Sequence, residues 1–329
     1  MIRYVLKRLL QMIPVFLGVI LIVFLINKAS GDPVNMILDV NATEEQRQEL
    51  RENLGLDKPV IVQYFNYVVD IVTGFDLGES YLTGQSMKTE VLTRFPVSLK
   101  LAVISVAFAV LVGIPVGIIS ATKQYSILDY VVTFLTLLLA ALPAFLLGLI
   151  LILYFSCYLK VLPAAGLDTW VHWILPTIAL AMPPVATLCR TTRSNMLEVI
   201  RQDYIRTARA KGLSERTVIF RHALKNALIP ILTVVGMQIT VIIGSSVVLE
   251  SIFTLPGIGT MIRTGISTSD SPMILASIVV LAITVSITNL LVDIAYGFVD
   301  PRIRAQYASH RKKKKTAPAK PADGTKGDS

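Results

Sequence analysis

The residues whose chemistry is easiest to interpret form a basic segment, Asp203 to Pro230, which lies between two long apolar runs. Within it, Tyr204 to Lys211 predicts a short helix. Gly212 is suited to end that helix, because glycine enters the left-handed conformation without steric cost. Ser214 is placed to cap a second helix that continues into the next apolar run. Such an elbow is suited to bind another protein, since a compact basic element held by two helices can dock into a groove on that protein.

We expect the docking face of this elbow to combine small side chains with positive charge. Ile205, Ala208 and Gly212 recur at helical spacing and leave one face with little bulk. Arg206 and Arg209 form a charged edge beside that face. The alternative is an ordinary basic cytoplasmic loop, which is common in membrane proteins. The candidate docking residues are Tyr204, Ile205, Arg206, Ala208, Arg209, Ala210 and Gly212.

Patterns for catalysis, metal binding or nucleotide binding are nearly absent from the chain. The three histidines, His172, His222 and His310, are scattered, and there is no H-E-x-x-H or other Cys/His set with the spacing of metal ligands. Neither G-x-S-x-G nor the phosphate-binding G-x-x-x-x-G-K-[ST] occurs. We therefore expect no catalytic residue, no metal and no cofactor in this chain.

The elements that must position the elbow are membrane helices. Hydrophobic residues make up 53% of the chain and charged residues 16%, a composition outside the range of ordinary soluble domains. Six uncharged runs are long enough, or nearly so, to cross a bilayer core of about 30 Å. These runs are Leu9–Ile26, Leu101–Thr122, Tyr130–Leu159, Trp173–Cys189, Asn226–Leu249 and Ser271–Val292.

Two of these runs are unusual. The third would span about 45 Å as a straight helix, so we expect it to tilt, to bend at Pro143 or to extend beyond the membrane. The fourth is short and contains Pro176, Pro183 and Pro184, which predicts a weak and kinked span. We interpret the first run as a retained span, because Asn27-Lys28-Ala29 is a poor cleavage site for a signal peptide.

The distribution of lysine and arginine predicts the orientation. With the N-terminus inside, segments 1–8, 123–129, 190–225 and 299–329 are internal and hold 22 of the 31 basic residues but 7 of the 22 acidic ones. The external segment 27–100 holds 11 acidic and 7 basic residues. This asymmetry places both termini in the cytoplasm. The net charge of +9 is thus a topology signal, and we expect contact with membrane lipid and none with nucleic acid.

The same topology places the two cysteines, Cys157 and Cys189, on opposite membrane faces, so no disulfide between them is expected. The external region 28–100 is too long to be only a connector between two spans. Thr43-Glu44-Glu45-Gln46 fits a capping box for a helix that ends near Leu54, with Gly55 as its stop. Pro59 is suited to start a second helix, Val60 to Val72, which ends at Gly74. This helical layer either contacts an external partner or only covers the spans.

The chain therefore divides into four parts. Residues 1–27 form the cytoplasmic N-terminus and first transmembrane helix, and residues 28–97 form an extracytoplasmic helical insertion. Residues 98–298 form a five-helix membrane core with the elbow at about 201–213. Residues 299–329 form a basic tail, which we expect to be mostly disordered because it lacks large apolar residues.

Several motifs, taken in order along the chain, resemble the membrane-spanning permease subunit of bacterial dipeptide, oligopeptide and nickel ABC importers. The resemblance covers about residues 1–304. It is carried by Gly31-Asp32-Pro33, Leu54-Gly55-Leu56-Asp57, Asp76-Leu77-Gly78-Glu79-Ser80, Tyr204–Gly212, Arg221-His222-Ala223, Asn226-Ala227, Glu250–Gly259, Asp293, Tyr296 and Asp300-Pro301-Arg302-Ile303-Arg304.

The resemblance implies an all-α membrane protein with six transmembrane helices of the type I ABC-importer permease kind, located in the bacterial cell membrane. It also implies four partners: a second, homologous permease subunit, two ATP-binding subunits that carry ATP and Mg²⁺, and an extracytoplasmic solute-binding protein. The elbow would be the coupling helix, which inserts into a groove on an ATPase subunit. The broader importer pattern is E-A-A-x-x-x-G. Here Arg206 replaces the leading Glu, which removes the basis for a salt bridge from that position, whereas Ala208 and Gly212 are retained.

A translocation pathway implied by this resemblance should meet polar or adaptable residues of the fifth span and of the turn that follows it. The candidates are Met237, Gln238, Ser245, Ser246, Glu250, Pro256 and Gly257. Glu250 would meet a peptide amine or a metal cation; alternatively, it is solvated or paired with an arginine. Asp293, near the inner end of the last span, is expected to make a structural contact with Arg302 or the elbow.

Two other classes of protein lack support in the sequence. An intramembrane enzyme requires a nucleophile with its base, or metal ligands, inside the spans, and neither is visible. A self-sufficient secondary transporter requires ion-coupling acids at mid-membrane, and these are missing. Peptide is the leading substrate class, with nickel chelates, haem, glutathione and sugar oligomers as alternatives.

Overall fold

The computed structural model describes residues 2–29, 33–38 and 42–299, and this part of the chain consists of helices joined by turns and loops, with one isolated bridge between Glu79 and Ser86. Asp32, the closing motif Asp300–Arg304 and the basic tail lie outside the described residues. The helices, in chain order, are α1 Ile2–Ala29, α2 Val34–Ile37, α3 Glu44–Asn53, α4 Val60–Gly74, α5 Met87–Thr122, α6 Ile127–Ala141, α7 Ala144–Leu151, η1 Ile152–Tyr158, η2 Trp170–Trp173, α8 Ile174–Ile200, α9 Asp203–Ala210, α10 Glu215–Thr217, η3 Val218–Ala223, α11 Leu224–Ile252, α12 Ile258–Thr268 and α13 Ser271–Val299.

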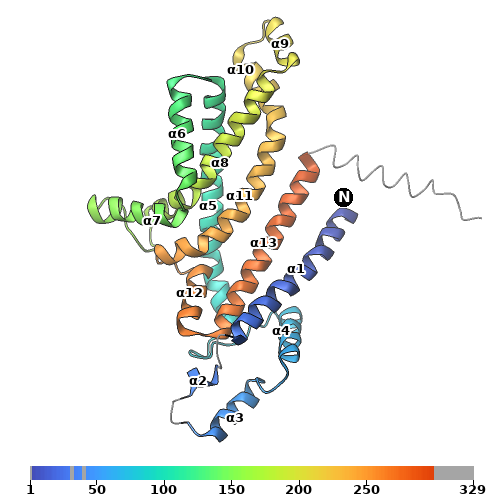
Figure 1. Cartoon of the computed structure of the whole chain (residues 1–329), viewed down its shortest axis with the longest axis vertical. Helices are drawn as coiled ribbons and strands as arrows, with labels where there is room; N and C mark the ends of the chain where they lie inside the picture. Colours follow the sequence, from blue (N-terminus) through green and yellow to red (C-terminus); the bar gives the residue numbers. More distant parts are fainter. Residues whose placement is uncertain (1, 30–32, 39–41, 300–329) are drawn as a thin grey trace, which may run out of the picture.

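Five helices in the described residues are long and apolar enough to cross a membrane. They contain α1, α5, α8, α11 and α13, and the pair α6–α7 makes a sixth span if it is counted as one broken span. The bend between α6 and α7–η1 is 102° and lies at Leu142–Pro143, so the third apolar run bends at the proline. Figure 1 shows α7 leaving the bundle almost at right angles to α6. The predicted membrane architecture is confirmed.

The helix with the weakest apolar signal, α8, lies at the centre of the bundle. Its most apolar window has a mean hydropathy of 1.4 and is 61% buried, whereas the window of α1 has a mean hydropathy of 2.9 and is 6% buried. A helix surrounded by other helices does not need the lipid-facing side chains that a peripheral helix needs. α8 runs as one helix through Pro183 and Pro184 and packs against α5, α6 and α11.

Close contact between α5 and α8 depends on two glycines of α5. A Cβ added at Gly113 would lie 2.9 Å from Leu188 Cβ, and one added at Gly117 would lie 2.6 Å from the carbonyl oxygen of Cys189. Small residues four apart let two membrane helices approach at the level of their backbones. The backbones of α5 and α8 are therefore in close contact at these two glycines.

The helices α3 and α4 agree with the sequence. Thr43 accepts a hydrogen bond from the Gln46 N–H, Gln46 accepts one from the Thr43 N–H, and α3 ends at Asn53 before the left-handed Gly55. α4 follows Pro59 and ends at Gly74. The predicted capping box and both helices are confirmed. The first membrane-core helix, in contrast, begins at Met87 and not near residue 98, so α5 takes up the last part of the predicted insertion.

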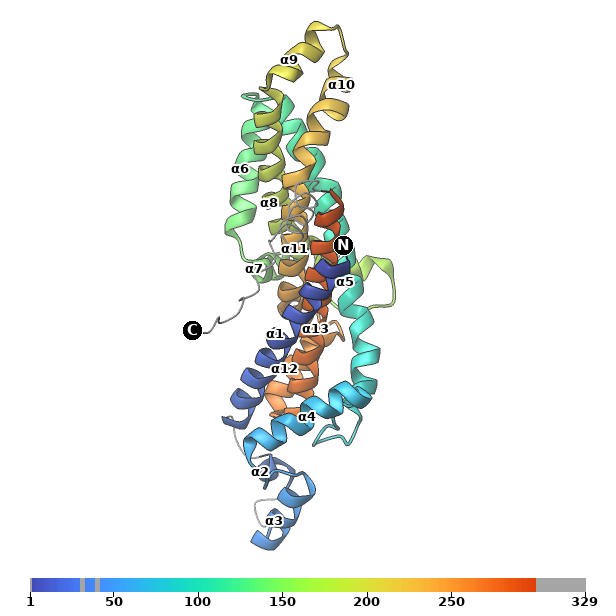
Figure 2. The same cartoon turned by 90° about the vertical axis from the view of Figure 1, so that its right-hand side faces the viewer.

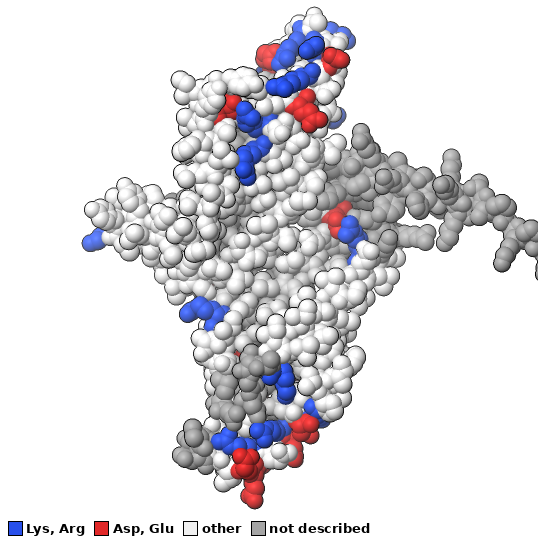
Figure 3. Space-filling model, viewed as in Figure 1, with Lys and Arg blue, Asp and Glu red and all other residues white. Residues whose placement is uncertain are grey.

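Figure 2 shows that α4 lies across the end of the bundle beside α1. The Tyr64 hydroxyl donates a hydrogen bond of 2.9 Å to the carbonyl oxygen of Leu17, and the Tyr64 ring meets that of Phe24 edge to face. Figure 3 shows charged side chains gathered over α9–α10 at one end and around α3 at the other, with a largely uncharged surface between them. This distribution is that of a chain whose middle faces lipid.

Asp293 makes a structural contact, as expected, but its partner among the described residues is not in the elbow. Its carboxylate lies 3.1 Å from the Arg8 guanidinium, so it joins α13 to α1 and does not reach the elbow. Arg302 lies outside the described residues. An acidic side chain in a membrane helix is stabilised by such a partner from a neighbouring helix.

Candidate functional site

The elbow has the geometry that its sequence predicts. α9 ends at Ala210, and Gly212 has a φ of 75°, in the left-handed region. Ser214 caps the next turn by accepting a hydrogen bond of 3.4 Å from the Thr217 N–H. The chain then continues through the π-helical η3 into α11. Figure 1 shows the elbow projecting beyond the membrane helices at one end of the molecule.

The small face of the elbow points toward its own bundle, which corrects the expected docking surface. Ile205 is fully buried and Ala208 is nearly so, in a cluster that includes Met196 of α8 and Ala227 of α11. These two residues attach the elbow to the bundle. A Cβ added at Gly212 would meet nothing within 4 Å, so within this chain Gly212 is needed for its backbone conformation.

The outward face of α9 is polar and positively charged. Tyr204, Arg206, Arg209 and Ala210 are exposed. Arg209 donates to Glu215 across the elbow at 2.7 and 3.3 Å. The Tyr204 hydroxyl accepts a hydrogen bond of 3.0 Å from the Asn226 amide.

Tyr204 and Arg209 thus also hold the elbow in shape. Arg206 is only loosely paired, with Asp203 at 3.9 Å, and leaves 76% of its side chain exposed. Of the two arginines of α9, Arg206 is therefore the one that is more available to contact a partner protein.

A second arrangement of polar groups lies at the turn between α11 and α12. Glu250 is fully buried, and its Oε2 accepts a hydrogen bond of 2.6 Å from the Gly259 N–H. Ser98 of α5 accepts one of 2.8 Å from the Ile258 N–H. A Cβ at Gly257 would collide with the Glu250 carboxylate. Glu250 is thus neither solvated nor paired with an arginine, and it does not face open space; it stabilises the N-terminus of α12.

The other pathway candidates are spread over different environments. Met237 is 61% exposed, Pro256 is exposed and Gln238 is half-buried. Ser246 is buried and donates to the Ile243 carbonyl oxygen, so it faces the interior of the bundle. Ser245 lines a cavity of about 300 Å³ at the α6–α7 corner. The other residues of that cavity are Ala140, Ala141, Leu142, Pro143, Ala144, Leu180, Pro183, Pro184, Val241 and Ile242.

Two further polar pairs that join helices of the bundle are not predicted by the sequence. Thr240 of α11 donates a hydrogen bond of 2.8 Å to Asn289 of α13, and Asp129 of α6 pairs with Arg193 of α8. Asn289 and Asp129 are visible in the sequence as polar residues in or beside apolar runs. Their partners lie 49 and 64 residues away, so only the fold identifies them.

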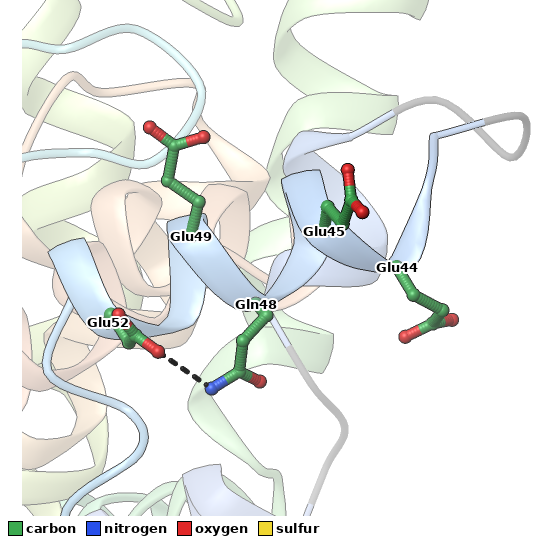
Figure 4. A pocket seen from close by; sticks show the side chains of 5 residues that line it. All are labelled: Glu44, Glu45, Gln48, Glu49 and Glu52. Atoms are coloured by element: carbon green, nitrogen blue, oxygen red, sulfur yellow. Dashed lines mark hydrogen bonds between the residues drawn. The ribbon is translucent and has the colours of Figure 1, made fainter.

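Helix α3 presents an acidic face, which Figure 4 shows from close by. Glu44, Glu45, Glu49 and Glu52 line an open hollow of about 500 Å³ together with Gln48, whose amide donates to Glu52 at 3.0 Å. No three His, Cys, Asp or Glu side chains in residues 2–29, 33–38 and 42–299 are arranged as a metal site.

Sequence comparison identifies the family of the chain. Residues 113–305 match the model of the binding-protein-dependent transport system inner membrane component, and residues 1–102 match the N-terminal model of the same membrane component. The chain belongs to this family. It is a permease subunit of a binding-protein-dependent ABC importer, a multi-pass inner membrane protein and a non-catalytic subunit. The family implies ATPase and binding-protein partners for this permease.

Curated relatives match the permease over almost their whole length. It is 41% identical to the oligopeptide transport system permease protein AppB of Bacillus subtilis, with 92% of this chain and 99% of that protein covered. It is 40% identical to the di/tripeptide transport system permease protein DppB of Pseudomonas aeruginosa, with 93% and 100% covered. It is 37% identical to the glutathione transport system permease protein GsiC of Pectobacterium atrosepticum, with 92% and 99% covered.

A solved structure shares the fold of the permease. The inward-facing MetNI methionine ABC transporter contains a chain that aligns with a TM-score of 0.56 and 18% identity, over 65% of this permease and 98% of that chain. The predicted fold class is confirmed by this likeness and by the helical membrane architecture.

Proposed function

We propose that this permease forms half of the passage of an importer for di- and oligopeptides. The observation that carries this proposal is the 41% identity, over nearly the full length, to an oligopeptide permease. A second permease with similarity to this one would complete the passage. Two ATPase subunits would bind ATP and Mg²⁺ on the cytoplasmic side, and a solute-binding protein would deliver the peptide from outside.

The charge pattern supports an orientation with the elbow and both termini in the cytoplasm. The elbow segment is rich in arginine and lysine, and α3 at the opposite end is rich in glutamate. In this orientation α9 is the coupling helix, with Tyr204, Arg206, Arg209, Ala210 and Gly212 toward the ATPase. ATP binding would draw the paired elbows together, and the helices above them would move as packed units that switch the passage from inward-facing to outward-facing.

The passage itself would use the polar residues of α11 and α13 that remain accessible. Met237 and Gln238 of α11 remain candidates, and Asn289 of α13 joins them because it is an exposed amide in an apolar helix. Ser245 at the α6–α7 corner is a further candidate, since it lines a cavity. We assign Glu250 and Gly257 to the outer gate and not to cargo contact, because both are buried in the turn that they hold.

Glutathione is the second candidate substrate, because permeases of glutathione systems are 37% identical over the same length. Glutathione is itself a tripeptide, so both candidates belong to one chemical class.

The test is uptake of labelled di- to pentapeptides, and of labelled glutathione, into proteoliposomes. These would contain the permease with its second permease, ATPase subunits and binding protein. Uptake that requires ATP, the binding protein and this subunit is expected. Failure to import any of these from an assembled complex that hydrolyses ATP would refute the peptide assignment. The controls omit ATP or the binding protein in turn.

A further inference from the structure

The carboxylate of Asp129 ties three segments together near the elbow. Asp129 lies in the first turn of α6 and is 2% exposed. Its Oδ1 accepts from Arg193 Nε of α8 at 2.6 Å and from the Ser120 hydroxyl of α5 at 2.5 Å. Its Oδ2 accepts from Arg193 Nη2 at 2.7 Å and from the Tyr125 N–H at 3.1 Å. The two parallel bonds from Arg193 fix the angle between the groups as well as their distance.

Arg193 stands on the helix that leads into the elbow. It precedes the end of α8 at Ile200 by about 10 Å of helix. The elbow is itself packed on this part of the bundle, through the cluster that joins Ile205 and Ala208 to Ile118 of α5 and Met196 of α8. A displacement of α9 is therefore passed directly to the part of α8 that carries Arg193.

Asp129 is one of the few side chains of α6 that are buried against the rest of the bundle. Asp129 and Thr136 are the only buried residues of α6. Most of its large apolar side chains, such as Tyr130, Phe134 and Leu138, are exposed in this chain. The ion pair at the first turn is therefore a specific polar link between α6 and α8, beside their apolar packing.

The opposite end of α6 is the 102° corner at Leu142–Pro143. That corner lines the cavity of about 300 Å³ to which α8 contributes Pro183 and Pro184 and α11 contributes Ser245. α6 thus connects the neighbourhood of the elbow to a hollow between three helices. A helix anchored at one end by a bidentate ion pair can carry a displacement along its length, because packed helices shift between discrete arrangements and do not deform continuously.

We propose that Asp129 and Arg193 are positioning residues for transport, which make α6 follow α8 when the elbow moves and so carry that motion to the corner at Pro143. This role rests on the proposed function of α9 as the coupling helix. Neither residue touches cargo or nucleotide in it. The ion pair determines how much of each ATP-driven displacement reaches the passage.

The experiment measures ATP hydrolysed per labelled peptide imported by the full complex in proteoliposomes. The main variant is Asp129→Asn with Arg193→Gln, which removes both charges together and leaves no buried charge unpaired. We expect normal assembly, continued ATP hydrolysis and a rise of about fivefold or more in ATP used per peptide, the range typical of a lost coupling between sites. An unchanged ratio would overturn the proposal.

The matched control is Glu90→Gln with Arg94→Gln. This removes another ion pair of 2.6 Å, on the outer half of α5, and is expected to leave the ratio unchanged. An equal rise in the control would show that the effect is not specific to the Asp129–Arg193 pair and would also overturn the proposal. Arg193→Lys is a second test variant, which keeps both charges of the ion pair but cannot form the two parallel hydrogen bonds. It should raise the ratio by a smaller factor, and a wild-type ratio in this variant counts against the proposal even where the double variant fails to assemble.

The stimulation of ATP hydrolysis by the binding protein is measured in the same complexes. A wild-type complex that shows this stimulation but imports no labelled peptide would refute the peptide assignment alone. The ion pair would then still be tested, because the double variant is expected to lose most of the stimulation. Retention of full stimulation would overturn the role of Asp129 and Arg193.

Discussion

Glu250 Oε2 accepts a hydrogen bond of 2.6 Å from the Gly259 N–H, although nine residues separate them and a turn lies between. The carboxylate closes the link from α11 to α12 from inside the protein. Since Gly257 leaves no room for a Cβ beside it, the motif from Glu250 to Gly259 has a structural explanation.

Replacing Glu250 by Ala should destabilise this turn. The Gly259 N–H would lose its partner in a buried position, at a cost of about 1–3 kcal/mol. Glu250→Gln keeps an oxygen acceptor of similar shape and should cost less. Thermal unfolding of the purified permease measures both, with Glu79→Ala outside the turn as the control. Equal stability of the Ala variant and the wild type would show that the hydrogen bond does not hold α12.

Replacing Gly117 by Leu should separate α5 from α8. Even a Cβ at this position would lie 2.6 Å from the Cys189 carbonyl oxygen, so a larger side chain must push the helices apart, at about 1–3 kcal/mol or more. We expect a lower unfolding temperature and poor assembly with the ATPase subunits. The control is Gly244→Ala in α11, where an added Cβ meets nothing within 4 Å and alanine favours a helix by up to about 1 kcal/mol. A Gly117→Leu variant as stable as the control would contradict the close packing.

Gly212 offers a test of why glycine is needed in the elbow. Its φ of 75° favours Gly or Asn, and its surroundings within the chain are open. Gly212→Ala should cost about 1–2 kcal/mol of elbow stability, whereas Gly212→Asn should cost less. Peptide uptake per ATP hydrolysed would show the consequence. If Asn restores the uptake that Ala loses, the requirement at Gly212 is for its backbone conformation. If Asn and Ala are equally impaired, the contact with the ATPase groove does not tolerate any side chain at this position.

Local features of this permease could be predicted from its sequence, and the direction in which side chains face could not. The capping box at Thr43, the stop at Gly212 and the bend at Pro143 depend on neighbouring residues alone. The spacing of Ile205 and Ala208 predicts a shared helix face, but a face of this kind suits a partner and the protein's own bundle equally well. The bundle occupies it here, because α8 and α11 supply the matching surface.

The role of Glu250 could not be predicted from the sequence for a related reason. A carboxylate at the end of an apolar run predicts a functional or paired residue, and its partner proved to be the backbone of a turn a few residues later. The Asp129–Arg193 pair joins residues 64 apart on helices whose proximity no local pattern encodes. Long-range pairs of this kind appear only once α5, α6 and α8 have been packed.

The two faces of α9 should respond differently to substitution, and this contrast tests the assignment of the elbow. Ile205→Ala removes a fully buried side chain and should cost about 2–5 kcal/mol, so we expect a less stable elbow as well as weaker binding of the ATPase subunits. Arg206→Glu alters an exposed side chain and should change stability by no more than about 0.5 kcal/mol. It should nevertheless weaken ATPase binding, because it reverses the charge at Arg206 on the outward face.

Thermal unfolding of the permease alone, together with co-purification of the ATPase subunits, separates the effect on stability from the effect on ATPase binding. Normal ATPase binding by Arg206→Glu would mean that this face of α9 does not bear the contact, and the adjoining exposed residues Lys211 and Leu213 would then be the next to change.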